Sequence, residues 1–94
     1  MPYLVIKHKV KDFDNWKTQF DNFADFRKSS GEKSYSIMHP ADDPNDLVGI
    51  FEWDSIENAQ KFVKAPELKE AMSKAGVISE PEIEFMKEST SGSL

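Results

Sequence analysis

The segment from Pro44 to Phe62 constrains the fold of this chain more than any other. Residues 47–53 form a short run of apolar, β-branched and aromatic residues, which is typical of a largely buried strand. Asp54 and Glu57 follow at the spacing of a capping box, which would supply acceptors to the free amides of a helix start. A buried strand that leads directly into a helix indicates mixed α and β structure.

Three further segments are expected to pair with this strand. The predicted strands are residues 3–10, 33–39, 47–53 and 82–88. The segment 33–39 is polar and ends before a proline, which suits the edge of a sheet. The turn at residues 42–46 contains Pro and Asx residues, and it predicts an antiparallel hairpin with 47–53.

The segments between the predicted strands have apolar residues at helical spacing. A first helix is expected from Asp12 or Asp14 to Ser29, with Trp16, Phe20 and Phe23 on its apolar stripe. A second helix is expected over residues 55–64. A third, over residues 67–75, would follow Pro66 and stop before Gly76.

The resulting order, β-α-β-β-α-β, predicts an α+β ferredoxin-like fold, with a four-stranded antiparallel sheet and the helices on one face. A chain of 94 residues has room for one core, so residues 1–88 are expected to form a single domain. The Ser/Gly-rich end, residues 89–94, is expected to be disordered.

The central strands carry apolar side chains on both faces. One face of the first strand holds Leu4, Ile6, His8 and Val10, and the other holds Tyr3 and Val5. Since the helices cover only one face, the second face most simply packs on a second copy of the chain, sheet against sheet. The alternative is that the ends of the strands are exposed.

Composition excludes several classes of function. The chain has no cysteine, which rules out disulfides, thiolate metal ligands and a cysteine nucleophile. The net charge of -5 disfavours nucleic acid as a partner, because phosphate binding needs a basic surface. No apolar run has the length of a membrane span and the start lacks a signal-peptide pattern, so we expect a cytoplasmic protein without a membrane partner.

Several segments resemble the antibiotic biosynthesis monooxygenase-like proteins. They are residues 8–12 (His-Lys-Val-Lys-Asp), Trp16, residues 51–55 (Phe-Glu-Trp-Asp-Ser), and residues 65–72 (Ala-Pro-Glu-Leu-Lys-Glu-Ala-Met). The resemblance implies a dimeric α+β barrel, with a pocket in each subunit between the sheet and the helices. The family includes cofactor-independent monooxygenases that act on aromatic polyketides, haem-degrading enzymes, and many proteins of no established activity.

The candidate site residues are indicated partly by the strand and helix patterns and partly by the family resemblance. His8 shares a face with apolar residues, and its ordinary pKa near 6.5 suits a pocket acid or base, although a core histidine is the alternative. The resemblance places Trp53 at the family's pocket tryptophan, so His8 and Trp53 are the predicted catalytic pair. The predicted substrate-binding residues are Trp16, Phe20, Phe23, Tyr35 and Met72, for which core packing is the alternative.

No cofactor and no metal are expected. The haem-degrading branch needs an asparagine in the first strand and a histidine on the second helical segment, where this chain has Ile6 and Met72. The two histidines lack the spacing of a metal motif. The leading hypothesis is a small-molecule enzyme or binding protein similar to cofactor-independent monooxygenases, with a small aromatic or hydrophobic ligand. The alternative is a non-catalytic dimeric module that binds a ligand or a protein.

Overall fold

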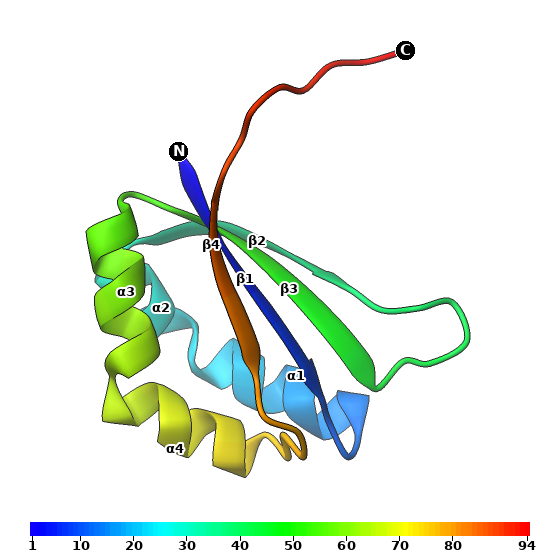
Figure 1. Ribbon diagram of the computed structural model, residues 1–94. Helices are drawn as coiled ribbons and strands as arrows, with labels where there is room; N and C mark the ends of the chain where they lie inside the picture. Colours follow the sequence, from blue (N-terminus) through cyan, green and yellow to red (C-terminus); the bar gives the residue numbers. More distant parts are fainter.

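The computed structural model describes all 94 residues. It contains four strands and four helices (Figure 1). In chain order they are β1 (Pro2–Lys9), α1 (Phe13–Asn22), α2 (Ala24–Ser30), β2 (Glu32–Met38), β3 (Asp46–Trp53), α3 (Ile56–Lys64), α4 (Pro66–Lys74) and β4 (Glu82–Lys87). None of the helices combines the length and the apolar character needed to traverse a bilayer.

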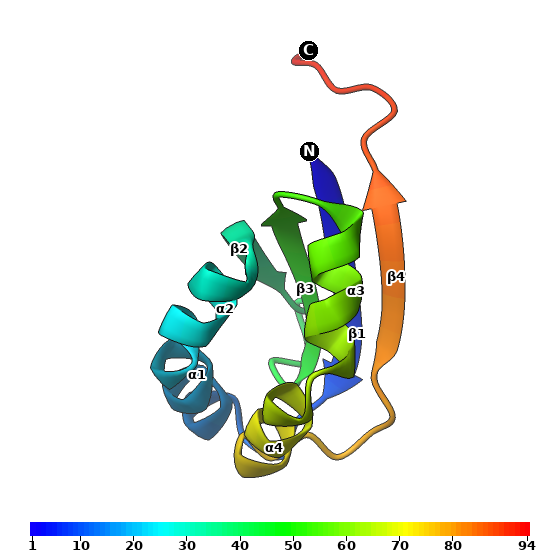
Figure 2. The same ribbon diagram turned by 90° about the vertical axis from the view of Figure 1, so that its left-hand side faces the viewer.

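The four strands form one sheet in the order β2-β3-β1-β4, and every neighbouring pair is antiparallel. All four helices lie against the same face of this sheet (Figure 2). This arrangement confirms the predicted ferredoxin-like α+β fold. Residues 88–94 carry no helix or strand and lead away from the sheet beyond β4 (Figure 1).

The core lies between the sheet and the helices. In β1 and β3, alternate side chains point toward the helices, and the most deeply buried are Leu4, Leu47 and Trp53. Trp16 and Phe20 of α1 and Phe62 of α3 pack against them from the helical layer. Burying these large side chains is the main stabilising contribution available to a chain of this size.

The prediction of a single long helix over residues 12–29 is wrong, because the structure has two helices there. Asp12 does cap the first of them, since its side chain accepts a hydrogen bond of 3.0 Å from the Asn15 amide, but α1 ends at Asn22 and α2 begins at Ala24. The break at Phe23 turns α2 relative to α1. Phe23 and Phe26 then stack at 4.9 Å, and both lie about 6 Å from Phe62 of α3. The three rings form an aromatic cluster at the break, which joins α2 to α3.

The capping residue of α3 also differs from the prediction. Ser55, not Asp54, accepts the hydrogen bond from the Asn58 amide, at 3.1 Å. Asp54 instead accepts from the side-chain amide of Asn58, at 3.0 and 3.1 Å. Both residue types favour the N-cap position, so the sequence alone does not separate the two neighbours. The other elements begin and end within one residue of the predicted bounds.

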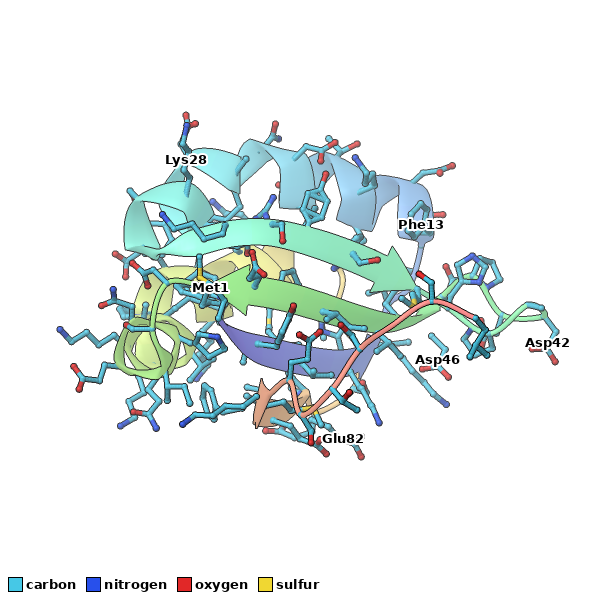
Figure 3. The ribbon with its side chains drawn as sticks, turned by 90° about the horizontal axis from the view of Figure 1, so that it is seen from above. Met1, Phe13, Lys28, Asp42, Asp46 and Glu82 are labelled. Atoms are coloured by element: carbon cyan, nitrogen blue, oxygen red, sulfur yellow. The ribbon has the colours of Figure 1, made fainter.

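The second face of the sheet carries no helix, and Figure 3 looks onto it. On this face, residues of β1 and β3 are paired across the strands: Val5 lies opposite Ile50, and Lys7 lies opposite Val48. Val5 is 9% exposed even in the single chain, while Val48 and Ile50 are half-buried. Met38 and Met86, on the edge strands, are about half exposed on the same face. The face is therefore apolar at its centre and open.

Candidate functional site

A small cavity lies between the sheet and the helices. It has a volume of about 60 Å³, and most of its lining is hydrophobic. Five of the seven predicted site residues line it, namely His8, Trp16, Phe20, Phe23 and Met72. A cavity of about 150 Å³ suffices for benzene, so a ring enters this one only if lining side chains move. Met72 is suited to such movement, because an unbranched thioether side chain adapts its shape easily.

One wall of the cavity is aromatic. The indole of Trp16 stacks on the ring of Phe20, with ring centres 4.7 Å apart and planes 16° apart. Phe13 extends the stack behind Trp16 at 5.9 Å. Helical spacing places these side chains on successive turns of α1, so the stack follows directly from the sequence. Because Phe13 and Phe20 both stack on Trp16 and Arg27 lies over Phe20, a ligand in the cavity would meet the edges of these rings and not their faces.

His8 lies at one end of the aromatic wall. It projects from β1 toward the helices, is 8% exposed, and its Nδ1 atom has no hydrogen-bond partner. Burial lowers the pKa of its imidazole below the ordinary value of 6.5, because the charged form loses its hydration. His8 is therefore neutral at neutral pH and is able to accept a proton from a ligand.

Arg27 closes the other end of the wall, and the sequence analysis did not select it. Its guanidinium carbon lies 3.7 Å from the centre of the Phe20 ring. Its Nη2 donates to the Phe20 carbonyl oxygen at 3.2 Å, and its Nη1 donates to Oε2 of Glu32. Arg27 and Glu32 both line the cavity, and each side chain is 7% exposed.

This ion pair is incompletely satisfied. The Nε atom of Arg27 and the Oε1 atom of Glu32 are buried and have no partner. Leaving a buried polar atom without a partner costs about 1–3 kcal/mol. Burial raises the pKa of the Glu32 carboxyl above its ordinary value, although the adjacent Arg27 acts to lower it.

The local sequence explains how the pair forms. Arg27 belongs to α2, and the break at Phe23 brings its guanidinium back over the Phe20 ring of α1. Gly31 then adopts a φ of +124°, a conformation that side chains other than glycine rarely take, and turns the chain from α2 into β2. The only signal in the sequence is a basic residue near apolar helix positions, followed by a glycine and an acidic residue, and this pattern does not show that the two charges are buried.

Two predicted site residues do not line the cavity. Trp53 is fully buried, packs on Phe62 with ring centres 4.9 Å apart, and has no partner for its Nε1 atom. Tyr35, on the edge strand, is 46% exposed and meets the Phe20 ring edge-on at 5.0 Å. In this arrangement Trp53 supports the core behind the site, and Tyr35 covers the outer side of Phe20.

The cavity adjoins the molecular surface between α1 and α4. Gln19, Phe23 and Ala71 border both the cavity and an outer depression of about 280 Å³. Glu70 and Lys74 of α4 lie on that outer depression. Gln19, which was not among the predicted site residues, therefore stands between the cavity and this depression.

Gly49 of β3 shapes the floor of the cavity. A β-carbon at this position would lie 2.5 Å from two ring carbons of Phe51, well inside van der Waals contact. The β1–β3 register runs through Gly49 without a bulge. The glycine is therefore needed so that Phe51, another lining residue, lies flat against the strand.

The cavity does not fit a haem group. Ile6 and Met72, the two residues that the resemblance sets against the haem-degrading branch, both line the cavity, but Ile6 offers no polar atom. A volume of about 60 Å³ is also far too small for a tetrapyrrole. No group of three or more His, Asp or Glu side chains is placed to hold a metal ion.

Comparison with known proteins relies on structure, since no family model and no curated protein sequence matches this chain. SnoaB, a cofactor-independent oxygenase from Streptomyces nogalater, superposes with a TM-score of 0.77 at 15% identity, covering 96% of this chain and 94% of SnoaB. A protein from Bordetella bronchiseptica, assigned to the antibiotic biosynthesis monooxygenases, gives a TM-score of 0.80 at 8% identity, covering 95% and 97%.

A protein from Nitrosomonas europaea with the same assignment gives a TM-score of 0.71 at 14% identity, covering 96% of this chain and 100% of its own. At these identities the likeness concerns the fold. The resemblance noted in the sequence is confirmed at that level: this chain has the fold of the antibiotic biosynthesis monooxygenase-like proteins over nearly its whole length.

Proposed function

We propose that this protein is a small-molecule enzyme that oxidises a small hydroxylated aromatic compound without a cofactor. The observation that carries the proposal is the neutral, unpartnered imidazole of His8 at the end of a cavity with a stacked aromatic wall. The fold shared with SnoaB, a cofactor-independent oxygenase, supports the same class of reaction.

The residues of the cavity have distinct roles in this proposal. The ligand ring packs against the edges of Trp16 and Phe20, whose mutual stacking holds them in place. His8 accepts the proton of the ligand hydroxyl, and the resulting anion gives electrons to oxygen. With hydroquinone, two electrons and two protons pass to oxygen, which leaves as hydrogen peroxide, and the ligand leaves as benzoquinone. The apolar lining excludes water, which strengthens the interaction between the imidazolium and the anion.

The size of the cavity limits the substrate. A ligand of ordinary drug size needs roughly 300–1,000 Å³, several times the volume present. We therefore expect a compound with a single ring, admitted by rotation of Met72 and Gln19. The aromatic polyketides of the related enzymes are larger than this.

Oxygen consumption tests the proposal. The purified protein, treated with chelator, is mixed with hydroquinone or a substituted phenol, and oxygen uptake is compared with that of the buffer. We expect uptake above the spontaneous rate, and its loss in His8→Ala. Binding of these compounds with no oxygen uptake would favour the alternative, a non-catalytic binding module. Absence of binding would contradict the enzyme and the ligand-binding module, and would favour a module that binds a protein.

We also propose that the chain assembles as a homodimer through the open face of the sheet. The support is the apolar centre formed by Val5, Val48 and Ile50, which remains partly uncovered in the single chain. The cavity lies on the opposite, helical side of the sheet. Each subunit would then carry a complete site of its own.

A further inference from the structure

The ion pair between Arg27 and Glu32 is unusual in its position. Both side chains are 7% exposed, and both line the cavity rather than the surface. The chain's other two ion pairs, Lys17–Asp21 and Lys74–Glu70, lie on exposed helix surfaces. A buried pair that serves only stability is expected to satisfy all its polar atoms, because each remaining one destabilises the fold.

The polar atoms of this ion pair that have no hydrogen-bond partner determine which ligand groups could bind there. Arginine has five N–H donors and no acceptor, and the donor on Nε is unused here. The Oε1 atom of Glu32 is an unused acceptor. At this end of the cavity, Nε of Arg27 and Oε1 of Glu32 are a donor atom and an acceptor atom without any partner, while the two opposite charges cancel.

We infer that Arg27 and Glu32 form a polar end of the cavity that selects ligands carrying a neutral polar group, such as a hydroxyl or an amide. This group would accept a hydrogen bond from Nε of Arg27 or donate one to Oε1 of Glu32. This inference rests on the proposed function and adds to it two specificity-determining residues. A ligand carboxylate is disfavoured, because it would approach the carboxylate of Glu32 in a region of low dielectric constant.

The geometry also sets the orientation of the ligand. Arg27 lies over Phe20, and His8 meets the neighbouring ring of the stack, Trp16, edge-on. A ring held along the stack would place one substituent at the ion pair and another toward the imidazole. The unpartnered atoms of Arg27 and Glu32 are shielded from solvent in this structure, so contact with them requires the cavity to widen at this end.

Two isosteric probes test the selection by charge. Benzamide and benzoate have the same shape, but only benzoate is anionic at pH 7. The wild-type protein is expected to bind benzamide more tightly. Glu32→Gln leaves Arg27 with an uncompensated charge, and the preference should shift toward benzoate by about tenfold, the equivalent of one charge-assisted hydrogen bond. A purely structural ion pair would not change this ratio.

Asp21→Asn is the matched control. It removes one negative charge from the exposed Lys17–Asp21 pair and so repeats the change in net charge away from the cavity. The ratio of affinities should remain that of the wild type. An equal shift in both variants would mean a general charge effect and would overturn the inference, as would an unchanged ratio in Glu32→Gln.

A second measurement needs no variant and covers the case in which Glu32→Gln does not fold. The Nε–H resonance of Arg27 is followed by nitrogen-15 NMR while benzamide or toluene is added to the wild type. Benzamide should move this resonance and toluene should not; equal effects would overturn the inference. Binding of both probes without selectivity would leave the proposed cavity function standing, whereas no binding of any probe would overturn both.

Discussion

The imidazole of His8 meets the indole of Trp16 edge-on, with ring centres 6.1 Å apart and planes at 69°. This contact joins the central strand β1 to helix α1 at the cavity. The indole surface that the imidazole contacts is apolar, and the Nδ1 atom of His8 has no hydrogen-bond partner. The surroundings therefore favour an uncharged histidine, with consequences for stability and for ligand binding.

The first prediction concerns pH. Burial lowers the pKa of His8 in the folded chain, so below about pH 6.5 the unfolded chain binds the additional proton and stability falls as the pH falls. His8 contributes at most about 1.4 kcal/mol per pH unit to the slope of the unfolding free energy against pH. Urea unfolding between pH 7 and pH 5 should show this loss in wild type and a smaller one in His8→Gln. His39→Gln, which changes an exposed histidine, should behave like wild type; an unaltered slope in His8→Gln would contradict the prediction.

The second prediction separates function from stability at the same residue. His8 borders a cavity and leaves a polar atom unsatisfied, so His8→Ala should lower the melting temperature only slightly while altering the response to aromatic ligands. Trp53→Ala, in the closed core, should instead cost about 3–5 kcal/mol. Thermal melts with and without phenol measure both effects. A large drop for His8→Ala with an unchanged ligand response would make His8 a core residue.

The third prediction concerns Gly49. An added methyl group would overlap the Phe51 ring, so Gly49→Ala should displace that ring, narrow the cavity and cost about 1–3 kcal/mol of unfolding free energy. Gly92→Ala is the control, because a β-carbon there has no neighbour within 4 Å. Denaturant unfolding of the two variants measures the difference. Equal stabilities would mean that the ring moves without cost.

The fold was largely predictable because its information is local and periodic. Alternation in β1 and β3 placed Leu4 and His8 on the helical face, and the structure confirms it. The break at Phe23 was not predictable, since no proline or glycine interrupts residues 12–30 and the ring that Phe23 contacts there, Phe62, belongs to another element.

The candidate site was predictable only in its apolar part. Trp16 and Phe20 follow from helical spacing, and both line the cavity. Arg27 and Glu32 were missed because burial of a charge depends on a partner in a different element, and neither residue is distinctive alone. Trp53 was expected at the cavity, but it lies behind Phe62, since the direction of a side chain at a strand end depends on how the helices cover it.

The fourth prediction concerns the energy of the buried ion pair. Removing one partner leaves an uncompensated buried charge, so Arg27→Met alone should destabilise the chain by about 3–5 kcal/mol. Replacing both partners with methionine should cost much less, since no charge remains buried. A double-mutant cycle by denaturant unfolding measures the coupling. The same cycle on Lys17 and Asp21, an exposed pair, should give about 0.5 kcal/mol, and a similarly small value for the buried pair would contradict the prediction.

The last prediction concerns assembly through the open face of the sheet. Val5 and Ile50 are direct cross-strand neighbours at the centre of that face, where a second copy would bury them. Sedimentation at micromolar concentration should therefore give a species of twice the chain mass of 10.7 kDa.

Ile50→Glu should convert the dimer to monomer, because two carboxylates would be buried across the two-fold axis without a partner. Ile78→Glu is the matched control: Ile78 is 66% exposed and lies outside the sheet, so this variant should remain dimeric. Since the cavity lies on the other side of the sheet, monomeric Ile50→Glu should keep its affinity for phenol. A wild-type species of only 10.7 kDa would exclude the dimer, and loss of ligand binding in the monomer would show that the two faces of the sheet are coupled.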